Sequence, residues 1–202
     1  HYTTDLRGGV RMGDLKLHDR LSRGRLMSQP IERFGVITGM IETAENLAKD
    51  YGITREEADA FAVRSHQNAS KAWEEGKFAD HLVPVEVPQR RKDPIIFDHD
   101  EGYRADASME SLGALRAIDL KRDADAIVTA GNASQQNDAA AACLVVAEDK
   151  LEAMDLTPSL WFKGWAAAGC DPSRMGIGPV PAVERLFART GMGWDDIALV
   201  EL

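Results

Sequence analysis

The stretch TAGNASQQNDAAAACLVVAE, residues 129–148, joins a cluster of small and amide side chains to an apolar run. Two asparagines and two glutamines lie close to Ser134, and four consecutive alanines follow them. Small residues let a backbone approach a ligand closely, whereas the same polar residues are also common in turns. The cluster therefore predicts either an ordinary turn or the lining of a site, ahead of a buried strand over 141–147.

The sequence on both sides of this stretch alternates helical periodicity with short extended runs. Helices are predicted over 40–51, 54–75, 108–115 and 179–189, and Thr54 with Glu57 forms a capping box for the second. Further strands are predicted over 82–88, 94–98, 127–129, 160–169 and 196–202, and a hairpin arm over 8–21. The alternation after residue 127 favours an α/β core, and the part before it a separate helix-rich lobe.

Apolar spacing predicts which side of the first two helices is buried. The predicted buried residues of the first helix are Ile41, Ala44, Leu47 and Ala48. Those of the second helix are Ala58, Phe61, Ala62, Ala69, Ala72 and Trp73.

The charge pattern argues against a surface for polyanions. Lys and Arg number 24 and Asp and Glu 33, which gives a formal net charge of −9. No basic block outweighs this background, so neither nucleic acid nor an anionic membrane is the expected partner. The basic run over 89–92 is interpreted as a solvated loop rather than a phosphate contact.

The residue pattern predicts a cytoplasmic protein without a metal site. The sequence has no long apolar span and no signal-peptide pattern at its N-terminus. Its two cysteines, Cys143 and Cys170, are too few for a disulfide framework and fit a reducing compartment. The five histidines are scattered and form no HxxxH pair, so no metal ligands are predicted.

Three segments together carry a family resemblance. They are GMIETAENLAKDYGITREEADAFAVRSH (39–66), TAGNASQQNDAAAA (129–142) and DPSRMGIGPVPA (171–182). In this order and at these separations they resemble the middle portion of the thiolase family, the acetyl-CoA acetyltransferases and 3-ketoacyl-CoA thiolases. GVRMGDLKLHDRL, ahead of them, extends the resemblance over nearly the whole chain.

The resemblance implies an α/β fold made of a helix-rich loop domain and parts of two α/β core halves. Residues 1–136 would be the loop domain, which binds coenzyme A and makes tetramer contacts. Residues 137–150 would end the N-terminal core half, and 151–202 would begin the C-terminal half. Other strands of the core sheet would then lie outside this chain, which would leave the apolar residues of 141–202 without a partner layer.

The resemblance also implies a reaction and a set of catalytic groups. Thiolases use a nucleophilic cysteine that takes the acyl group, a histidine that activates it, and a second cysteine that moves a proton. We expect none of these three in this chain, so no catalytic residue is assigned and the 202-residue chain alone is predicted to be inactive. Cys143 is interpreted as a small core residue, and Cys170 as a partly exposed turn residue beside Asp171.

Binding residues follow from the resemblance at five positions. Ser134 would hydrogen-bond the pantetheine amides, and Ala130 would line the same tunnel. Arg116 would stack on or pair with the adenine-nucleotide end of coenzyme A. Met40 and Met175 would line the acyl pocket. Four of the five also have an ordinary structural interpretation: Ser134 as a turn or cap serine, Arg116 as a surface arginine, and the two methionines as core residues.

Two functions stay open at this point. The first is thiolytic cleavage of a 3-ketoacyl-CoA, or the reverse Claisen condensation, by an oligomeric enzyme that uses coenzyme A as substrate or product and has no resident cofactor. The second is a non-catalytic coenzyme A-binding or assembly module. Many short-chain family members have His-Met-Gly where this sequence has Gly39-Met40-Ile41, which favours a different or longer acyl chain.

Overall fold

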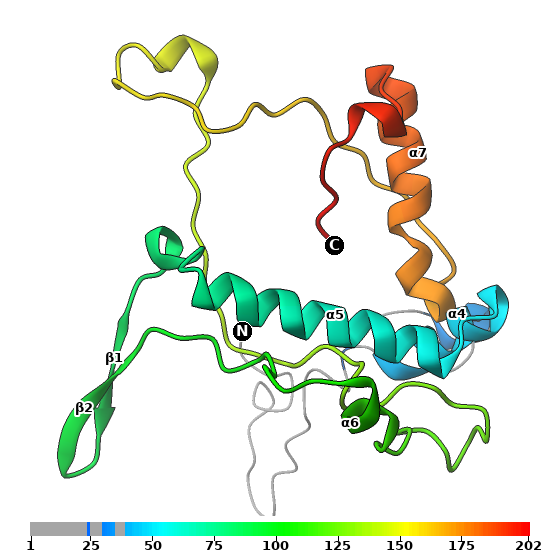
Figure 1. Cartoon of the computed structure of the whole chain (residues 1–202). Helices are drawn as coiled ribbons and strands as arrows, with labels where there is room; N and C mark the ends of the chain where they lie inside the picture. Colours follow the sequence, from blue (N-terminus) through cyan, green and yellow to red (C-terminus); the bar gives the residue numbers. More distant parts are fainter. Residues whose placement is uncertain (1–23, 25–29, 35–38) are drawn as a thin grey trace, which may run out of the picture.

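The computed structural model describes residues 24, 30–34 and 39–202 (Figure 1). The hairpin predicted over 8–21 lies outside the described residues. The described helices are α3 (Ile31–Phe34), α4 (Met40–Tyr51), α5 (Arg55–Glu74), α6 (Met109–Gly113) and α7 (Pro179–Thr190). Short 3₁₀ helices are η1 (Ala79–His81), η2 (Glu148–Lys150), η3 (Pro172–Ile177) and η4 (Trp194–Asp196), and the strands are β1 (Val85–Gln89) and β2 (Lys92–Phe97).

The boundary between α4 and α5 confirms the sequence prediction. Gly52 ends α4 with a left-handed φ of 64°, and its N–H donates to the Ala48 carbonyl. Thr54 begins α5 with a capping box, in which the Glu57 carboxylate accepts a hydrogen bond from the Thr54 N–H at 2.8 Å. This backbone hydrogen bond, together with one from the Thr54 hydroxyl, lowers the pKa of Glu57.

The buried faces of α4 and α5 differ in part from the apolar pattern. Ala44 and Phe61 are exposed, so those two predictions of burial are wrong. Each helix instead buries a carboxylate, Glu45 on α4 and Asp59 on α5, because another segment supplies hydrogen-bond donors to it. The complete buried sets are Thr43, Glu45 and Ala48 on α4, and Asp59, Ala62, Val63 and Ser70 on α5.

The predicted strand pair before residue 98 is confirmed as an antiparallel hairpin. Strand β1 pairs with β2 with Val85 opposite Phe97, and Figure 1 shows the hairpin projecting from the end of α5 away from the other helices. Arg91 in the turn has a φ of 62° and is exposed. The basic run over 89–92 therefore lies at a solvent-facing turn, in agreement with its interpretation as a loop.

The strands predicted after residue 126 are not strands in the described structure. The segments 141–147, 160–169 and 196–202 have no ladder partner among the described residues, and most of their apolar side chains are exposed. Val145, Leu160 and Leu199 are 85, 89 and 83 % exposed. A sequence can carry strand propensity, but a strand forms only where a neighbouring backbone completes its hydrogen bonds.

The last helix, α7, is confirmed, and arginine side chains join it to the extended segment 160–169. Arg185 donates to the Ala167 carbonyl at 2.8 Å, and Arg189 donates to the Trp165 carbonyl at 2.9 Å. The Arg189 guanidinium also lies 5.2 Å from the centre of the Trp165 ring. These contacts hold the segment beside α7 without a strand ladder.

Two sets of contacts join the described helices, one between α5 and α6 and the other between α4 and η3. Ala62, Val63, Ala107 and Leu112 form a small buried cluster where α6 packs on α5. At α4, Asn46 donates to the Ser173 carbonyl at 2.9 Å, and Asp50 pairs with Arg174 of η3. The hydrogen bond from Arg174 lowers the pKa of Asp50.

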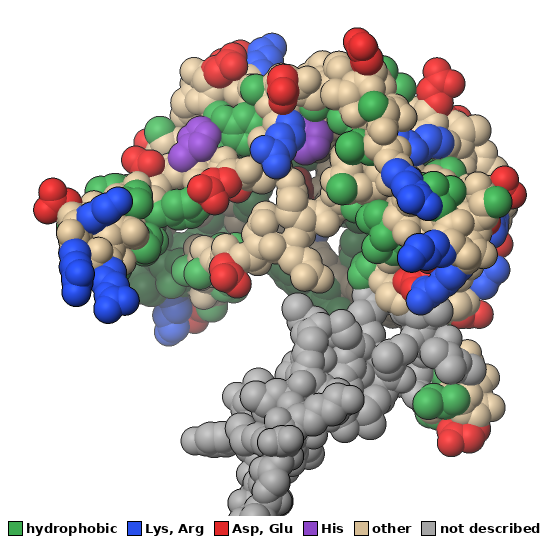
Figure 2. Space-filling view, turned by 90° about the horizontal axis from the view of Figure 1, so that it is seen from below, with side chains coloured by type: hydrophobic (Ala, Val, Ile, Leu, Met, Phe, Trp, Pro, Cys, Tyr) green, Lys and Arg blue, Asp and Glu red, His purple; other side chains and the backbone are tan. Residues whose placement is uncertain are grey.

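Much of the described surface is mixed in character. Figure 2 shows positive and negative side chains around one face, with hydrophobic side chains between them. Among the described residues, no helix combines the length and apolar character required to cross a bilayer.

Candidate functional site

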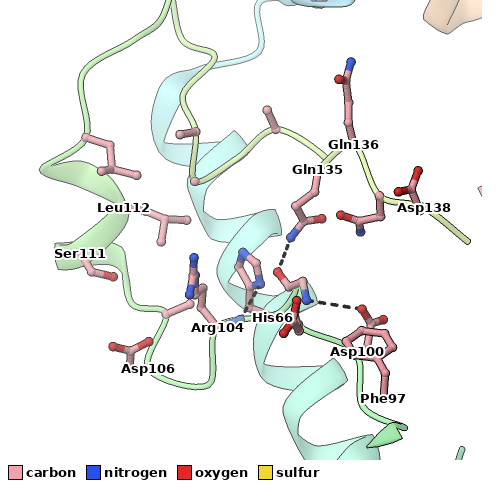
Figure 3. Close-up of a pocket in the computed structure, with 18 residues that line it drawn as sticks. His66, Phe97, Asp100, Arg104, Asp106, Ser111, Leu112, Gln135, Gln136 and Asp138 are labelled. Atoms are coloured by element: carbon pink, nitrogen blue, oxygen red, sulfur yellow. Dashed lines mark hydrogen bonds between the residues drawn. The ribbon is translucent and has the colours of Figure 1, made fainter. Parts of the chain in front are cut away.

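A cavity of about 830 Å³ lies beside α5 (Figure 3). His66 on α5 forms part of its wall. The other lining residues come from three segments of the chain: 97–107, 111–115 and 130–138. The stretch that opens with Thr129 therefore meets the end of α6 and the segment after β2 at one cavity.

The loop 129–134 is a tight turn built by its own polar side chains. Thr129 is fully buried, and its hydroxyl accepts hydrogen bonds from the Gly131 and Asn132 N–H groups at 3.1 and 3.2 Å. Asn132 Oδ1 accepts from the Thr129 N–H at 2.7 Å in return. Both interpretations of this cluster hold, because the segment is a turn and its Ala130 lines the cavity.

Glu45 of α4 holds the segment that leads into this loop. Its carboxylate accepts hydrogen bonds from the Ile127 N–H at 3.0 and 3.1 Å and from the Val128 N–H at 2.8 Å. The short strand predicted over 127–129 does not form, because this side chain takes two of the donors that a neighbouring strand would use. The carboxylate is buried, so these hydrogen bonds are shielded from water.

Gly131 lets the loop pack closely on the end of α6. A Cβ atom at this position would lie 2.6 Å from Leu115 Cδ1 and 2.9 Å from Leu112 Cγ. Real Cβ atoms essentially never make such contacts, so any other residue here requires the loop or the leucines to move. The width of this part of the cavity depends on that close approach.

The segment after β2, which forms another wall of the cavity, is fixed to α5 and to the segment 130–138. The Arg104 N–H donates to His66 Nδ1 at 3.2 Å, so neutral His66 carries its proton on Nε2. Gln135 Nε2 donates to the Gly102 carbonyl across the cavity, as the dashed line in Figure 3 shows. The segment after β2 is thereby joined to His66 of α5 and to Gln135 of the segment 130–138.

The charge of the lining limits what the cavity can bind. Asp100, Glu101, Asp106 and Asp138 line it, against the guanidinium of Arg104. Carboxylates repel phosphate groups, so the interior suits an uncharged chain that forms hydrogen bonds. The described residues contain no group of three or more His, Cys, Asp or Glu side chains that could hold a metal ion.

Comparison with known proteins identifies the family. Residues 1–149 of the 202 match the family model described as the thiolase N-terminal domain. The chain belongs to the thiolase family. It is 43 % identical to an acetyl-CoA acetyltransferase of Chromobacterium violaceum over 202 residues, which are all of this chain and 49 % of that relative.

Solved thiolase structures have the same fold. The chain matches a Bacillus anthracis acetyl-CoA acetyltransferase with a TM-score of 0.83 at 38 % identity, over 98 % of this chain and 48 % of that one. It matches human mitochondrial 3-ketoacyl-CoA thiolase with a TM-score of 0.76 at 32 % identity, over 97 and 47 %. The fold is thus thiolase-like α/β, and the chain spans about half the length of the relatives it matches.

Three of the five residues that the thiolase resemblance implies lie at or next to the cavity. Ala130 lines it. Ser134 lies between two lining residues and is exposed, and its hydroxyl donates to the Gln135 carbonyl at 3.3 Å. Arg116 is exposed and directly follows the lining residue Leu115. One of these positions therefore lines the cavity, and the other two directly neighbour a lining residue in the sequence.

The two methionines lie in a different part of this thiolase chain. Met40 begins α4 and is 54 % exposed, and Met175 is in η3 and is also exposed. Neither lines the cavity, but α4 and η3 pack against each other through Asn46 and Ser173. An acyl pocket at these methionines would be separate from the cavity walls.

One interpretation of the cysteines is wrong and the other is confirmed. Cys143 is exposed rather than a core residue, because the segment 141–147 has no partner strand among the described residues. Cys170 is partly exposed, as predicted, and its thiol donates to the Met175 carbonyl at 3.8 Å.

The sequence did not predict the side chains that shape this candidate site. Glu45 and Asp59 lie three residues before Ala48 and Ala62, which places each on the buried side of its helix. That spacing was a usable signal, but charged residues are rarely buried unless they are paired. Arg55, four residues before Asp59, is a local partner, but the partners at 127–132 are too distant in the sequence for the helical pattern to reveal them.

Proposed function

We propose that the protein to which this chain belongs is an acyltransferase that cleaves 3-ketoacyl-CoA with coenzyme A, or runs the reverse Claisen condensation. In thiolysis, a cysteine thiolate would attack the keto carbon and the bond between C2 and C3 would break, which leaves an acyl-enzyme and the enolate of acetyl-CoA. Protonation of that enolate releases acetyl-CoA, and the thiolate of coenzyme A then takes the acyl group. Membership of the thiolase family supports this proposal.

The observation that carries the proposal is the cavity bounded by the loop 129–134. The pantetheine arm of coenzyme A is an uncharged chain with two amides, which suits an acidic but hydrogen-bonding interior. The phosphates of the nucleotide end would lie outside the cavity, beside the exposed guanidinium of Arg116. Coenzyme A would therefore be substrate or product, with its arm in the cavity and its charged end at the rim.

The proposal includes a domain organisation. Residues 1–136 would form the coenzyme A-binding loop domain, 137–150 the end of the N-terminal core half, and 151–202 the start of the C-terminal half. The family match ends at residue 149, which supports the second boundary. The exposed apolar segments after 140 suit contact with further core strands. We propose a cytoplasmic homo-oligomer.

Arg116→Ala and Ser134→Ala are each expected to weaken coenzyme A binding by the intact protein by about 1 kcal/mol or more. The first loses a charge-assisted or stacked contact, and the second loses a hydrogen bond to a pantetheine amide. Isothermal titration calorimetry measures both effects. Arg64→Ala and Ser159→Ala are matched controls, because both residues are exposed and neither lines the cavity or directly neighbours a lining residue in the sequence.

Unchanged affinity in both Arg116→Ala and Ser134→Ala would show that coenzyme A does not use this site. Coenzyme A binding without any thiolysis of 3-ketoacyl-CoA would instead favour the non-catalytic module.

Cys143→Ala and Cys170→Ala are each expected to leave thiolysis of acetoacetyl-CoA by the intact protein within about threefold of the unsubstituted rate. Neither cysteine has the neighbours of the family's catalytic cysteines, and loss of a true nucleophile lowers a rate by about 10⁴-fold or more. Steady-state assays of thioester cleavage provide the measurement. A loss of several orders of magnitude in either variant would identify that cysteine as a catalytic residue and refute our assignment.

A further inference from the structure

A buried carboxylate on α5 is joined to both segments that we propose to hold coenzyme A. Asp59 is 2 % exposed. One of its oxygens accepts a hydrogen bond from Asn132 Nδ2 at 2.8 Å, and the other accepts from Arg55 Nε at 2.7 Å. Both oxygens are thus engaged, each toward a different part of the site.

The Asn132 side chain transmits this anchoring to the loop 129–134. Its Oδ1 accepts from the Thr129 N–H at 2.7 Å, and its Nδ2 also donates to the Ile127 carbonyl at 3.0 Å. These hydrogen bonds hold the backbone that leads into Ala130, which lines the cavity. Asp59 in turn fixes the amide orientation of Asn132, because a carboxylate accepts only from its NH₂ group.

The Arg55 side chain transmits the same anchoring to the end of α6. Its Nη2 donates to the Leu112 carbonyl at 2.7 Å and to the Leu115 carbonyl at 3.0 Å. Arg116 follows directly. A guanidinium is planar and its donors have fixed directions, so the position of the Leu115 carbonyl is set relative to Asp59.

We propose that Asp59 is a positioning residue that sets the separation between the loop 129–134 and the segment 112–116. One coenzyme A molecule would then engage both segments at once, its pantetheine arm on the first and its nucleotide end on the second. This inference rests on the proposed function. Linked groups gain affinity only when the geometry permits simultaneous engagement, and a separation fixed in advance removes the cost of ordering the two segments.

The proposal differs from a general stabilising role in what it predicts for the two halves of the ligand. Pantetheine and adenosine 3′,5′-bisphosphate each need only one segment, so their binding does not depend on the separation. A carboxylate that merely stabilises the fold would affect the two halves and the whole ligand alike. The ratio between whole and half affinities therefore reports positioning.

Asp59→Asn in the intact protein is the test. Asn132 and Arg55 donate to different oxygens of Asp59, and the amide replaces one of these oxygens with an NH₂ group, so one of the two connections is lost. We expect coenzyme A to bind at least about tenfold more weakly, and pantetheine and adenosine 3′,5′-bisphosphate each to change by less than about threefold. Calorimetry measures the affinity for coenzyme A. NMR titration measures the weaker affinities for pantetheine and for adenosine 3′,5′-bisphosphate.

Two further variants make the test specific. Arg55→Lys keeps the charge beside Asp59 but lacks the planar fork, so it should repeat the pattern of Asp59→Asn through the α6 side alone. Glu56→Gln, an exposed change from carboxylate to amide on the same helix, should leave all three affinities unchanged. Circular dichroism checks that each variant is folded.

The proposal is overturned if Asp59→Asn weakens the binding of pantetheine and of adenosine 3′,5′-bisphosphate as much as it weakens the binding of coenzyme A. It is also overturned if coenzyme A binds with unchanged affinity to Arg55→Lys and to Asp59→Asn. Absence of coenzyme A binding to the unsubstituted protein would refute the proposed function, and this inference with it. Weaker binding of coenzyme A in Asp59→Asn and Arg55→Lys, with the affinities for its two halves unchanged, would support the positioning role.

Discussion

Glu45→Ala is expected to lower the free energy of unfolding by about 3 kcal/mol. The substitution removes a buried carboxylate that accepts hydrogen bonds from the Ile127 and Val128 N–H groups. Leaving buried donors without a partner costs about 1–3 kcal/mol each, and hydrogen bonds to a charged group are the stronger kind. Urea denaturation of the intact protein measures the change, and amide hydrogen exchange should accelerate at residues 127 and 128.

Glu42→Gln provides the contrast on the same helix. Glu42 pairs with Arg122 at 2.7 Å, but the side chains are 24 and 68 % exposed. Solvent-exposed ion pairs contribute about 0–1 kcal/mol, so this variant should lose far less stability than Glu45→Ala. Similar small losses in both variants would show that Glu45 does not anchor the loop.

Gly131→Ala is expected to weaken coenzyme A binding by about tenfold or more and to destabilise the protein by about 1–3 kcal/mol. The added Cβ would lie 2.6 Å from Leu115 Cδ1 and 2.9 Å from Leu112 Cγ, so the loop must shift or the two leucines must repack. Overpacking of a closely packed contact costs energy of this order. We expect the loop to shift, because Leu112 is buried, and the shift would displace Ala130 from the cavity wall and lower the affinity.

Gly113→Ala is the matched control for this substitution. A Cβ at Gly113 meets nothing within 4 Å, and the residue lies in α6 beside the same contact. Alanine is favoured over glycine in a helix by up to about 1 kcal/mol, so stability should stay equal or rise. Calorimetry and urea denaturation of both variants give the comparison. Equal behaviour of Gly131→Ala and Gly113→Ala would contradict the close-approach argument.

Local signals in the sequence predicted the helices well. Gly52, the Thr54 capping box and the proline start of α7 act within one turn of the chain, so neighbouring residues determine them. The hairpin β1–β2 is equally local, because its strands are adjacent in the sequence.

Strands that need distant partners were not predictable in the same way. The segments 141–147 and 160–169 have strand-like composition, yet among the described residues no backbone lies beside them to complete a ladder. Ile127 and Val128 instead donate their N–H groups to Glu45, and Thr129 donates to the Asn132 side chain. Apolar composition cannot report whether a neighbouring strand or a side chain will supply the hydrogen bonds.

The candidate site was predicted in part. The small and polar composition of 129–138 indicated either a turn or a lining segment, and the resemblance implied that Arg116, Ala130 and Ser134 contact one ligand. The acidic lining and the buried Asp59 were not foreseen, because they depend on how α5 meets segments about 40 to 75 residues further along the chain. The apolar periodicity of a helix does not predict which distant segments pack against it.

Determining the structure of the intact protein with coenzyme A bound tests the central claim most directly. We expect the pantetheine arm to lie in the cavity along residues 130–134, with the adenine-nucleotide end beside Arg116. Coenzyme A bound at a place where neither the loop 129–134 nor Arg116 touches it would contradict the account.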